Sequence, residues 1–372
     1  MRAMYFIVFL ICLGCSSSDD PTDTTSEEMT TEEPTPTNGD TSNTTLYFPP
    51  IDSDTWETTA PELIGWNTNE LEPLHTFLID HNTKAFIILK DGKIVIEEYY
   101  NGALISDNNP WFSAGKTLTS FVTGMAQDDG LLSVDDTSST YLGNEWTAMS
   151  PEQEQAITVR NQLTMTSGGD YTVSNTSCTD PECLLYLNAP SNYWYYHNAF
   201  YTLLQPVLHE AIPEGFDTYF DNRLKNSIGM NGAWINIGFN RIYFSTARSM
   251  ARFGLLNLNE GNWDGTQLIS ASYFQEMTTS SQSLNPAYGY LWWLNGKDSY
   301  RLPSSTAQFS GSLIPNAPDD LIAGLGANDQ KLYVVPSKKL VVIRMGDSAG
   351  MEVLGPSGFD TELWEKINAV IE

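Results

Sequence analysis

The amino-acid sequence predicts an α/β fold of the α+β type, in which strands from both ends of the chain form one antiparallel sheet flanked by helices. Two β-hairpin patterns, at 86–96 and 332–343, lie near opposite ends of the folded part. The segment between them has mostly helical periodicity. We therefore expect an inserted α-rich region at about 140–285, with a cleft where this region meets the sheet.

Both hairpins consist of two apolar runs joined by a turn. In the first, Phe86–Leu89 and Ile94–Ile96 flank an Asp91-Gly92 pair, which favours a tight turn. In the second, Leu332–Val335 and Leu340–Ile343 flank a turn that contains proline. Each pair of runs is therefore predicted to form neighbouring antiparallel strands.

Two helices are predicted from apolar residues that recur every three or four positions. The first follows Ser113 and ends at Gly130, and the second closes the chain with Asp360 as its N-cap. Their apolar faces consist of Leu118, Phe121, Val122 and Met125 in the first helix and Leu363, Ile367, Val370 and Ile371 in the second.

The composition is that of a folded, acidic protein. Of the 372 residues, 41% are apolar, which is sufficient for the core of one large domain or two. Eighteen basic and 46 acidic residues give a formal net charge of −28. This charge has the wrong sign for phosphate backbones, so we expect no nucleic acid among the partners.

Residues 1–15 resemble the signal peptide of a bacterial lipoprotein. Arg2 precedes an apolar run from Tyr5 to Leu13 that is too short to cross a bilayer. The run ends at Gly14-Cys15, which resembles a lipobox and implies a diacylglycerol anchor on Cys15. We expect an exported lipoprotein anchored in an outer membrane, on its periplasmic or surface side, that contacts the membrane only through this anchor.

Residues 16–50 are predicted to form a disordered tether. Residues 16–45 hold eight acidic residues and no basic one, together with Ser, Thr and Pro and almost nothing to bury. The folded domain is then expected at 51–372.

Cys178 and Cys183 are the only cysteines beyond the first fifteen residues. In an exported protein, two thiols so close together in a loop-like segment are expected to form a local disulfide. No Cys or His stands near them at ligand spacing, so we predict neither a metal site nor a cofactor.

Two serines compete as the nucleophile. Ser348 lies in Gly346-Asp347-Ser348-Ala349-Gly350, which fits the Gly-x-Ser-x-Gly elbow pattern and follows a predicted strand. An elbow needs a helix directly after the serine and a histidine downstream. Gly350, Gly355 and Pro356 break any such helix, and the last histidine is His209. The elbow interpretation therefore fails, and Ser348 is better read as a turn serine.

The other candidate is Ser113, with Lys116 three positions later at the start of the predicted helix. Residues three apart on a helix share a face, so the lysine can reach the serine hydroxyl. The free N–H groups and positive end of a helix N-terminus favour an oxyanion and a neutral lysine. A helix-capping serine followed by a solvated lysine would have the same spacing.

Several segments, in order, resemble the serine β-lactamase and penicillin-binding-protein superfamily, closest to its class C-like esterases and 6-aminohexanoate-oligomer hydrolases. The resemblance covers about 80–350 and implies a β-lactamase-like fold. The matching segments are Trp111–Leu118, Leu163–Gly169, Tyr196–Asn198, Ser249–Gly254, Tyr288–Trp293 and Tyr333–Pro336.

The resemblance implies a Tyr-x-Asn motif whose phenol acts with the lysine as general base. The pattern occurs at Tyr99, Tyr186 and Tyr196. Tyr99 precedes the nucleophile within a strand region. Tyr196 is favoured over Tyr186, because a helical stretch follows it and the residues before it match the family. Asn198 is then the motif asparagine, and it is expected to bind substrate.

The third family motif is expected on the strand that faces the nucleophile, at Gly324-Leu325-Gly326-Ala327. Gly324 and Gly326 would let substrate lie close to this strand. The backbone N–H of Ala327, beside that of Ser113, would complete the oxyanion hole. Family members have a lysine or histidine at position 324, and this chain has glycine. The site is therefore poorly suited to a substrate carboxylate.

These residues predict a serine hydrolase that cleaves a small-molecule ester or amide through an acyl-enzyme on Ser113, with Lys116 and Tyr196 as the base. The alternatives are a cell-wall D,D-peptidase or weak β-lactamase, and a non-catalytic surface binding protein on the same scaffold. A monomer is expected. Three tryptophans near the motifs are candidates to line an apolar acyl pocket, with core packing as the alternative: Trp194, Trp292 and Trp293.

Overall fold

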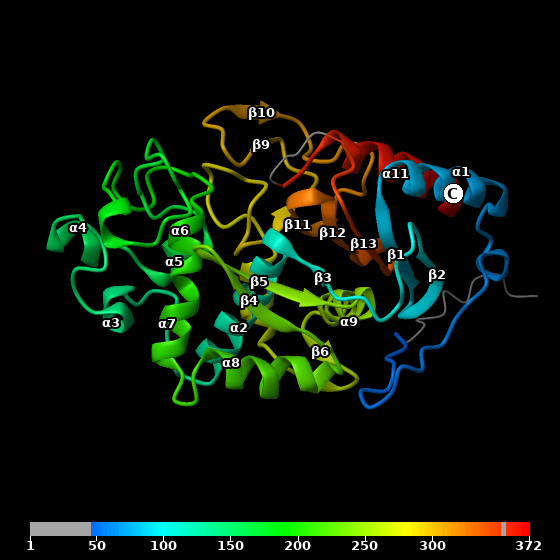
Figure 1. Ribbon diagram of the computed structural model, residues 1–372, viewed down its shortest axis with the longest axis horizontal. Coiled ribbons are helices and arrows are strands. Elements are labelled where there is room, and N and C mark those ends of the chain that lie inside the picture. Colours follow the sequence, from blue (N-terminus) through cyan, green and yellow to red (C-terminus); the bar gives the residue numbers. More distant parts are fainter. Residues whose placement is uncertain (1–45, 351–354) are drawn as a thin grey trace, which may run out of the picture. The chain divides into compact units, whose positions relative to one another are not determined.

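The structure is a computed structural model that describes residues 46–350 and 355–372. Its central feature is an antiparallel six-stranded sheet of order β2-β1-β13-β12-β11-β8 (Figure 1). Strands from both ends of the chain meet where β1 pairs with β13, which confirms the predicted α/β fold class. The strands are β1 (Thr83–Lys90), β2 (Lys93–Tyr99), β8 (Trp293–Leu294), β11 (Ile322–Gly326), β12 (Gln330–Val335) and β13 (Leu340–Gly346).

Both predicted hairpins form, with tight turns between their strands. Asp91 and Gly92 join β1 to β2 with positive φ angles of 51° and 84°. Gly92 is required for a second reason, since a Cβ there would come within 2.0 Å of the carbonyl oxygen of Tyr47. Strands β12 and β13 are buried throughout, as expected for strands covered on both faces.

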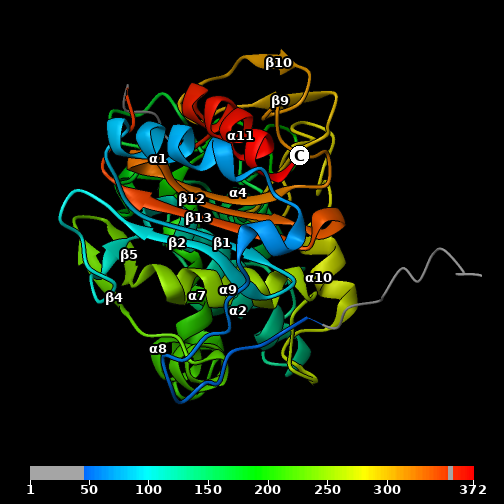
Figure 2. The ribbon, with the colours of Figure 1, turned by 90° about the vertical axis from the view of Figure 1, so that its right-hand side faces the viewer.

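Helices cover both faces of the sheet (Figure 2). Helices α1 (Leu71–Asp80) and α11 (Gly358–Ile371) pack together on one face. Helices α2 (Lys116–Asp128) and α9 (Ala247–Leu258) lie on the other. Helix α2 follows Ser113 as predicted, and its apolar face is fully buried.

The closing helix α11 starts differently from the prediction. Its N-cap is Ser357, and Asp360 is the third helical residue. The Asp360 side chain accepts a hydrogen bond from the backbone N–H of Ser357 in a capping box. Asp360 is fully buried and also accepts a hydrogen bond of 2.8 Å from Lys331 in β12. The carboxylate that the sequence identified as a cap therefore also binds the helix to the sheet.

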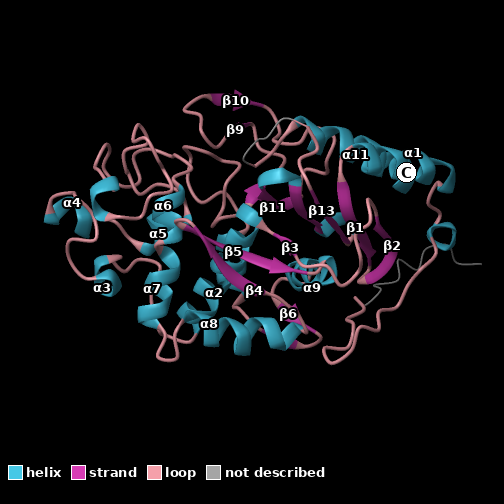
Figure 3. Ribbon diagram, viewed as in Figure 1, coloured by secondary structure: helices cyan, strands magenta, loops and turns pink. Residues whose placement is uncertain are grey.

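The segment at 140–285 is rich in helices, but it also contains a β-hairpin that the sequence did not predict (Figure 3). Strands β4 (Ala233–Ile237) and β5 (Asn240–Ser245) form this hairpin, and β5 also pairs with β3 (Asn109–Pro110) just before the nucleophile segment. The helices of this region are α3 (Ser139–Leu142), α4 (Pro151–Gln155), α5 (Val159–Leu163), α6 (Asn198–Thr202), α7 (Leu204–Ala211), α8 (Phe216–Tyr219) and α10 (Ala271–Met277), with α9 between α8 and α10. Short strand pairs complete the set: β6 (Asn262–Trp263) with β7 (Thr266–Gln267), and β9 (Ser299–Arg301) with β10 (Gln308–Ser310).

The folded domain begins before the boundary expected at residue 51. Residues 46–50 were assigned to the tether, yet the N–H of Tyr47 donates to the carbonyl of Asp91 at 3.0 Å. Arg252 donates to the carbonyl of Pro50 at 2.8 Å. The expected signal peptide, the anchor at Cys15 and the rest of the tether lie outside the described residues. Within the described ranges, no helix has the length and apolar character to cross a membrane.

Candidate active site

Ser113 and Lys116 lie side by side at the start of α2. Ser113 belongs to a short 3-10 turn, Phe112–Gly115, which leads directly into the helix, and Lys116 is the first residue of α2. The lysine Nζ donates a hydrogen bond of 3.0 Å to the Ser113 Oγ. Ser113 is half-buried and the lysine is buried, so this is a shielded pair and not a cap with a solvated lysine.

The backbone just before the nucleophile is strained and firmly held. Phe112 has a φ of 46°, which is costly for an aromatic residue. Trp111 fixes the chain on its other side, because its backbone N–H donates to Tyr243 and its indole N–H donates to Ser245, both at 2.8 Å. Strand β5 therefore sets the position of Ser113.

The environment of Lys116 favours its neutral form. Burial lowers the pKa of the amine from 10.5 to about 7, with no carboxylate among the causes of the shift. Its nearest aromatic contacts are the rings of Tyr201, 4.2 Å from Nζ to the centroid, and Tyr196, 5.2 Å away. An amine with a pKa near neutrality beside a hydroxyl has the properties of a general base.

Tyr196 is the Tyr-x-Asn tyrosine that the fold brings to Ser113. Its ring is buried and stacks on Trp293 with centroids 5.9 Å apart. Burial raises the pKa of Tyr196, and a hydrogen bond with Ser113 opposes that shift. Burial thus favours the protonated phenol beside the Ser113 hydroxyl, and it favours the neutral amine of Lys116.

The other two Tyr-x-Asn tyrosines lie elsewhere. Tyr99 ends β2 and donates a hydrogen bond of 2.7 Å to Glu97. Tyr186 is 40% exposed and forms an isolated bridge with Gly169. In the described part of the chain, none of the three tyrosines lines the pocket around Ser113, and what distinguishes Tyr196 is its hydrogen bond with the Ser113 side chain.

A pocket of about 210 Å³ opens onto the Ser113–Lys116 pair. Asn198, the first residue of α6, and Ala327, the first residue after β11, both line it, so four of the predicted site residues share one cavity. The lining residues are Phe112, Ser113, Lys116, Ser177, Asn198, Tyr201, Asn240, Arg241, Ile242 and Ala327.

Gly324 and Gly326 make room for the nucleophile segment. A Cβ on Gly326 would come within 2.3 Å of the carbonyl oxygen of Trp111, and one on Gly324 would come within 3.1 Å of the Thr117 side chain. Neither glycine lines the described pocket. Their small size therefore lets β11 lie against the Ser113 turn.

The sequence did not identify several residues that line this pocket. Tyr201 could have been identified from the sequence, because it lies three residues after Asn198 in a predicted helix and therefore shares its face. Asn240 and Ile242 come from the unpredicted hairpin, and Ser177 precedes Cys178. Cys178 and Cys183 form a disulfide with a Cα–Cα distance of 5.9 Å.

The three tryptophans proposed as pocket lining belong to the core. Trp194, Trp292 and Trp293 are each no more than 2% exposed. None of them is among the described residues that line the pocket. Core packing is therefore the role that the structure gives them, with Trp293 supporting Tyr196 from behind.

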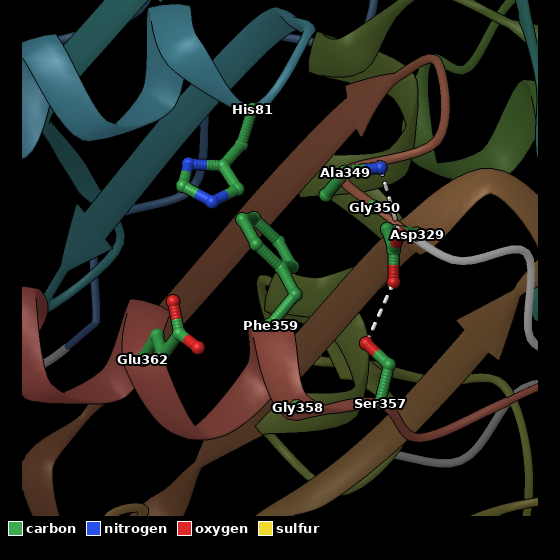
Figure 4. A pocket seen from close by; sticks show the side chains of 8 residues that line it. All are labelled: His81, Asp329, Ala349, Gly350, Ser357, Gly358, Phe359 and Glu362. Atoms are coloured by element: carbon green, nitrogen blue, oxygen red, sulfur yellow. Dashed lines mark hydrogen bonds between the residues drawn. The ribbon is translucent and has the colours of Figure 1, made fainter.

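Ser348 lies near a different pocket, shown in Figure 4. Its hydroxyl donates to the carbonyl of Gly350 at 3.0 Å, and the Nδ1 of nearby His81 is 2.7 Å from the carbonyl of Phe77. No Ser–His hydrogen bond joins the two among the described residues. The elbow interpretation of Ser348 has no support in this geometry.

The buried carboxylate of that second pocket has a structural role. Asp329 accepts hydrogen bonds from the backbone N–H of Ala349 at 3.0 Å and the hydroxyl of Ser357 at 2.8 Å (Figure 4). Lys331 lies 3.2 Å from it. These partners satisfy the carboxylate and connect the end of β13 to the start of α11. In the described ranges, no group of three or more potential ligands could hold a metal ion.

The fold and the Ser113 pocket together define a hydrolase scaffold of the serine β-lactamase and penicillin-binding-protein type. The Beta-lactamase family model matches residues 79–355, and the chain belongs to this family. A curated relative, an uncharacterized protein of Alkalihalophilus pseudofirmus, is 23% identical over 327 residues, covering 76% of this chain and 88% of the relative.

Solved structures with the same fold carry names from several branches of this family. A protein from Bacillus anthracis, provisionally named a 6-aminohexanoate-dimer hydrolase, is 18% identical with a TM-score of 0.65, covering 87% of this chain and 88% of that one. A provisionally named β-lactamase from Bacteroides dorei has the same TM-score at 15% identity, covering 82% and 99%. A penicillin-binding protein homologue from Caulobacter crescentus is 12% identical with a TM-score of 0.61, covering 82% and 98%.

Proposed function

We propose that the protein hydrolyses an ester or an uncharged amide through an acyl-enzyme on Ser113. The observation that carries the proposal is the hydrogen bond of 3.0 Å between Ser113 and a buried lysine whose pKa is lowered to about 7. A neutral amine at this distance can accept the serine proton as the bond to the substrate carbonyl forms.

The reaction has two halves. In the first, the Ser113 oxygen attacks the carbonyl carbon, its proton passes to Lys116, and the leaving alcohol or amine departs with a proton. In the second, water attacks the acyl carbon and loses a proton to the group that gave one up in the first half, and the Ser113 oxygen departs with the proton held by Lys116. The backbone N–H groups of Ser113 and Ala327 are the candidate oxyanion donors, and each such donor is typically worth a few kcal/mol.

Tyr196 is proposed to deliver the proton to the leaving group. Its raised pKa keeps the phenol protonated at neutral pH, so it is suited to donate a proton and poorly suited to accept one first. Lys116 and Tyr196 then exchange roles in the second half of the reaction. Because both groups contact the same hydroxyl, they are expected to titrate as a coupled pair.

A D,D-peptidase or β-lactamase activity is the second candidate within this family. Against it, position 324 is a glycine packed against Thr117, so this strand offers no cation for a substrate carboxylate. Arg241 does line the pocket, but its guanidinium is already paired with Asp217 at 2.6 Å. A labelled penicillin would distinguish the two. A covalent mass shift on Ser113 would favour the peptidase or β-lactamase reaction.

The experiment that tests the proposal compares the wild-type chain with Ser113→Ala. Wild type should turn over 4-nitrophenyl butyrate and be labelled on Ser113 by a fluorophosphonate probe, and the variant should lose both. Retained turnover in a clean preparation of the variant would refute the assignment. A non-catalytic binding protein would show neither turnover nor labelling in wild type.

We further propose that the protein is an exported lipoprotein anchored through Cys15. The disulfide between Cys178 and Cys183 supports export, because such bonds persist in oxidising compartments. The proposal predicts that wild type fractionates with membranes and that Cys15→Ser releases the protein into the soluble fraction. A wild-type protein that is already soluble would contradict it.

A further inference from the structure

The two faces of the β4–β5 hairpin have different surroundings. Residues that oppose each other on antiparallel strands share a face. One face therefore carries the pairs Trp234–Tyr243 and Asn236–Arg241, and the other carries Ile235–Ile242 and Ile237–Asn240.

The first face packs against the body of the protein. The Trp234 ring lies 5.8 Å from Phe216 and 5.7 Å from Phe220, centroid to centroid. On the same face, Arg241 forms an ion pair of 2.6 Å with Asp217 and also borders the Ser113 pocket. These partners belong to α8 and the turn that follows it, over which the hairpin lies in Figure 1.

The second face begins inside the Ser113 pocket and continues into solvent. Asn240 and Ile242 line the pocket, and Ile242 is only 9% exposed. Its cross-strand partner Ile235 is 45% exposed, and Ile237, two positions further along β4, is 48% exposed. An apolar strip therefore leads from the nucleophile pocket onto the open surface.

Exposed isoleucines are unusual on β4, because it is an edge strand. It forms the end of the three-stranded sheet β3-β5-β4, and its sequence, Ala-Trp-Ile-Asn-Ile, contains no charge. Exposed edge strands usually carry charged residues that prevent unwanted pairing. Two half-exposed isoleucines at this position are a liability unless they bind something apolar.

We propose that Ile242, Ile235 and Ile237 form a binding strip for the hydrocarbon chain of the substrate. The proposal rests on the hydrolase function and names its substrate class, an ester or amide with an extended apolar chain. We assign the strip to the substrate because it begins at Ile242, which lines the Ser113 pocket, so a substrate bound at Ser113 can extend along it. Opposed residues on neighbouring strands lie about 5 Å apart and residues two apart on one strand about 7 Å apart, so the strip is about 12 Å long and suits an extended chain better than an acetyl group.

The test compares substrates that differ only in chain length. Wild type is expected to have a higher kcat/KM for 4-nitrophenyl octanoate than for 4-nitrophenyl acetate. In the double variant Ile235→Thr, Ile237→Thr, the ratio of these two values should fall about tenfold, through a loss in the octanoate value. Threonine keeps the β-branched shape that suits a strand, so the hairpin should be retained.

The matched control is Ile51→Thr. Ile51 is also an exposed isoleucine, at 52%, and it does not line the Ser113 pocket in the described structure. This variant should keep the wild-type preference for octanoate. A second series, methyl and octyl butyrate, places the long chain on the alcohol side. A selective loss in either series supports the strip and shows which half of the substrate it binds.

Three results would overturn the strip. The first is an unchanged chain-length dependence in both series, and the second is an equal loss for every substrate. The third is a wild-type dimer that the double variant converts to monomers, which would assign this face to a second copy of the chain. If wild type cleaves no ester or amide at all, the proposed hydrolase function fails and the strip with it.

Discussion

Burial of the Lys116 amine has opposite consequences for reactivity and for stability. Water is excluded from the ammonium form, and this lowers the pKa from 10.5 to about 7. The same exclusion makes the neutral amine available near neutral pH, as the proposed role of Lys116 as base requires. It also disfavours the folded state whenever the amine carries a proton.

The activity of the free enzyme should therefore depend on the neutral form of Lys116. We expect kcat/KM for an uncharged ester to fall as the pH drops below about 7, following the protonation of one group. Stopped-flow or initial-rate measurements between pH 5 and 9 would test this, with those limits chosen to bracket the pKa by about two units. A flat profile across this range would contradict the role of Lys116.

Replacing the lysine should separate stability from activity. Between about pH 7 and 10.5 the unfolded chain binds more protons than the folded one, so the free energy of unfolding rises with pH. Lys116→Met should thus be more stable than wild type below about pH 7, and the difference should shrink toward pH 10.5. Its turnover should fall by about 10²- to 10⁴-fold. Urea unfolding at acidic and alkaline pH would measure the first effect, and equal differences at both would refute it.

The two tyrosines around Lys116 should differ in what their hydroxyl groups do. Tyr196→Phe keeps the stack on Trp293 and removes the phenol beside Ser113, so turnover should fall by about 10²-fold or more without unfolding. Tyr201→Phe is the matched control, because Lys116 contacts the Tyr201 ring and its hydroxyl lies 3.3 Å from Thr119. Similar losses in both variants would argue against a proton-transfer role for Tyr196.

At the scale of elements, the site depends on how closely β11 approaches the turn that carries Ser113. Gly326 lies so close to the carbonyl of Trp111 that a Cβ at this position would clash with the carbonyl oxygen. The backbone of β11 at Gly326 lies directly against the backbone at Trp111. This contact fixes Ser113 relative to Ala327, the residue after Gly326. The geometry of the proposed oxyanion donors is therefore set by packing between these elements and not by the Ser113 turn alone.

Adding one methyl group at Gly326 should disturb that geometry. Gly326→Ala is expected to cost about 1–3 kcal/mol of stability, the usual range for overpacking, and to lower kcat more than KM changes. Gly358→Ala, at the start of α11, is the control, because a Cβ there meets no atom within 4 Å. Thermal melts and steady-state kinetics on both variants would test the difference. A fully active Gly326→Ala would show that β11 does not position the oxyanion donors.

The hairpin at 233–245 shows why part of the site could not be predicted from sequence. A half-buried strand is recognised by alternation of apolar and polar residues. In β4, Trp234 packs on one face while Ile235 and Ile237 are apolar on the exposed face, so the alternation is lost. The residues that obscure the strand are the ones assigned here to substrate binding.

At the scale of the whole molecule, local signals were sufficient for strands β1, β2, β12 and β13 of the sheet and insufficient for the pocket. Each hairpin of the sheet is contiguous in sequence, so turn residues and apolar runs predicted both. Ser113 and Lys116 are also local, being one helical turn apart. Ala327 and Ile242 reach the pocket through tertiary packing, and only the first of them was anticipated, through the family resemblance.

The N-terminal boundary of the domain gives the last prediction. Residues 46–50 run along the domain, where Pro50 accepts a hydrogen bond from the buried Arg252 and Tyr47 bonds to Asp91. A chain that begins at Leu46 should therefore be more stable than one that begins at Ile51. The expected difference is about 1–3 kcal/mol, because the truncation removes both hydrogen bonds and the packing of Phe48 on Trp263, whose ring centroids lie 5.1 Å apart. Urea unfolding of the two chains measures it directly, and identical midpoints and slopes would show that the domain starts at residue 51 after all.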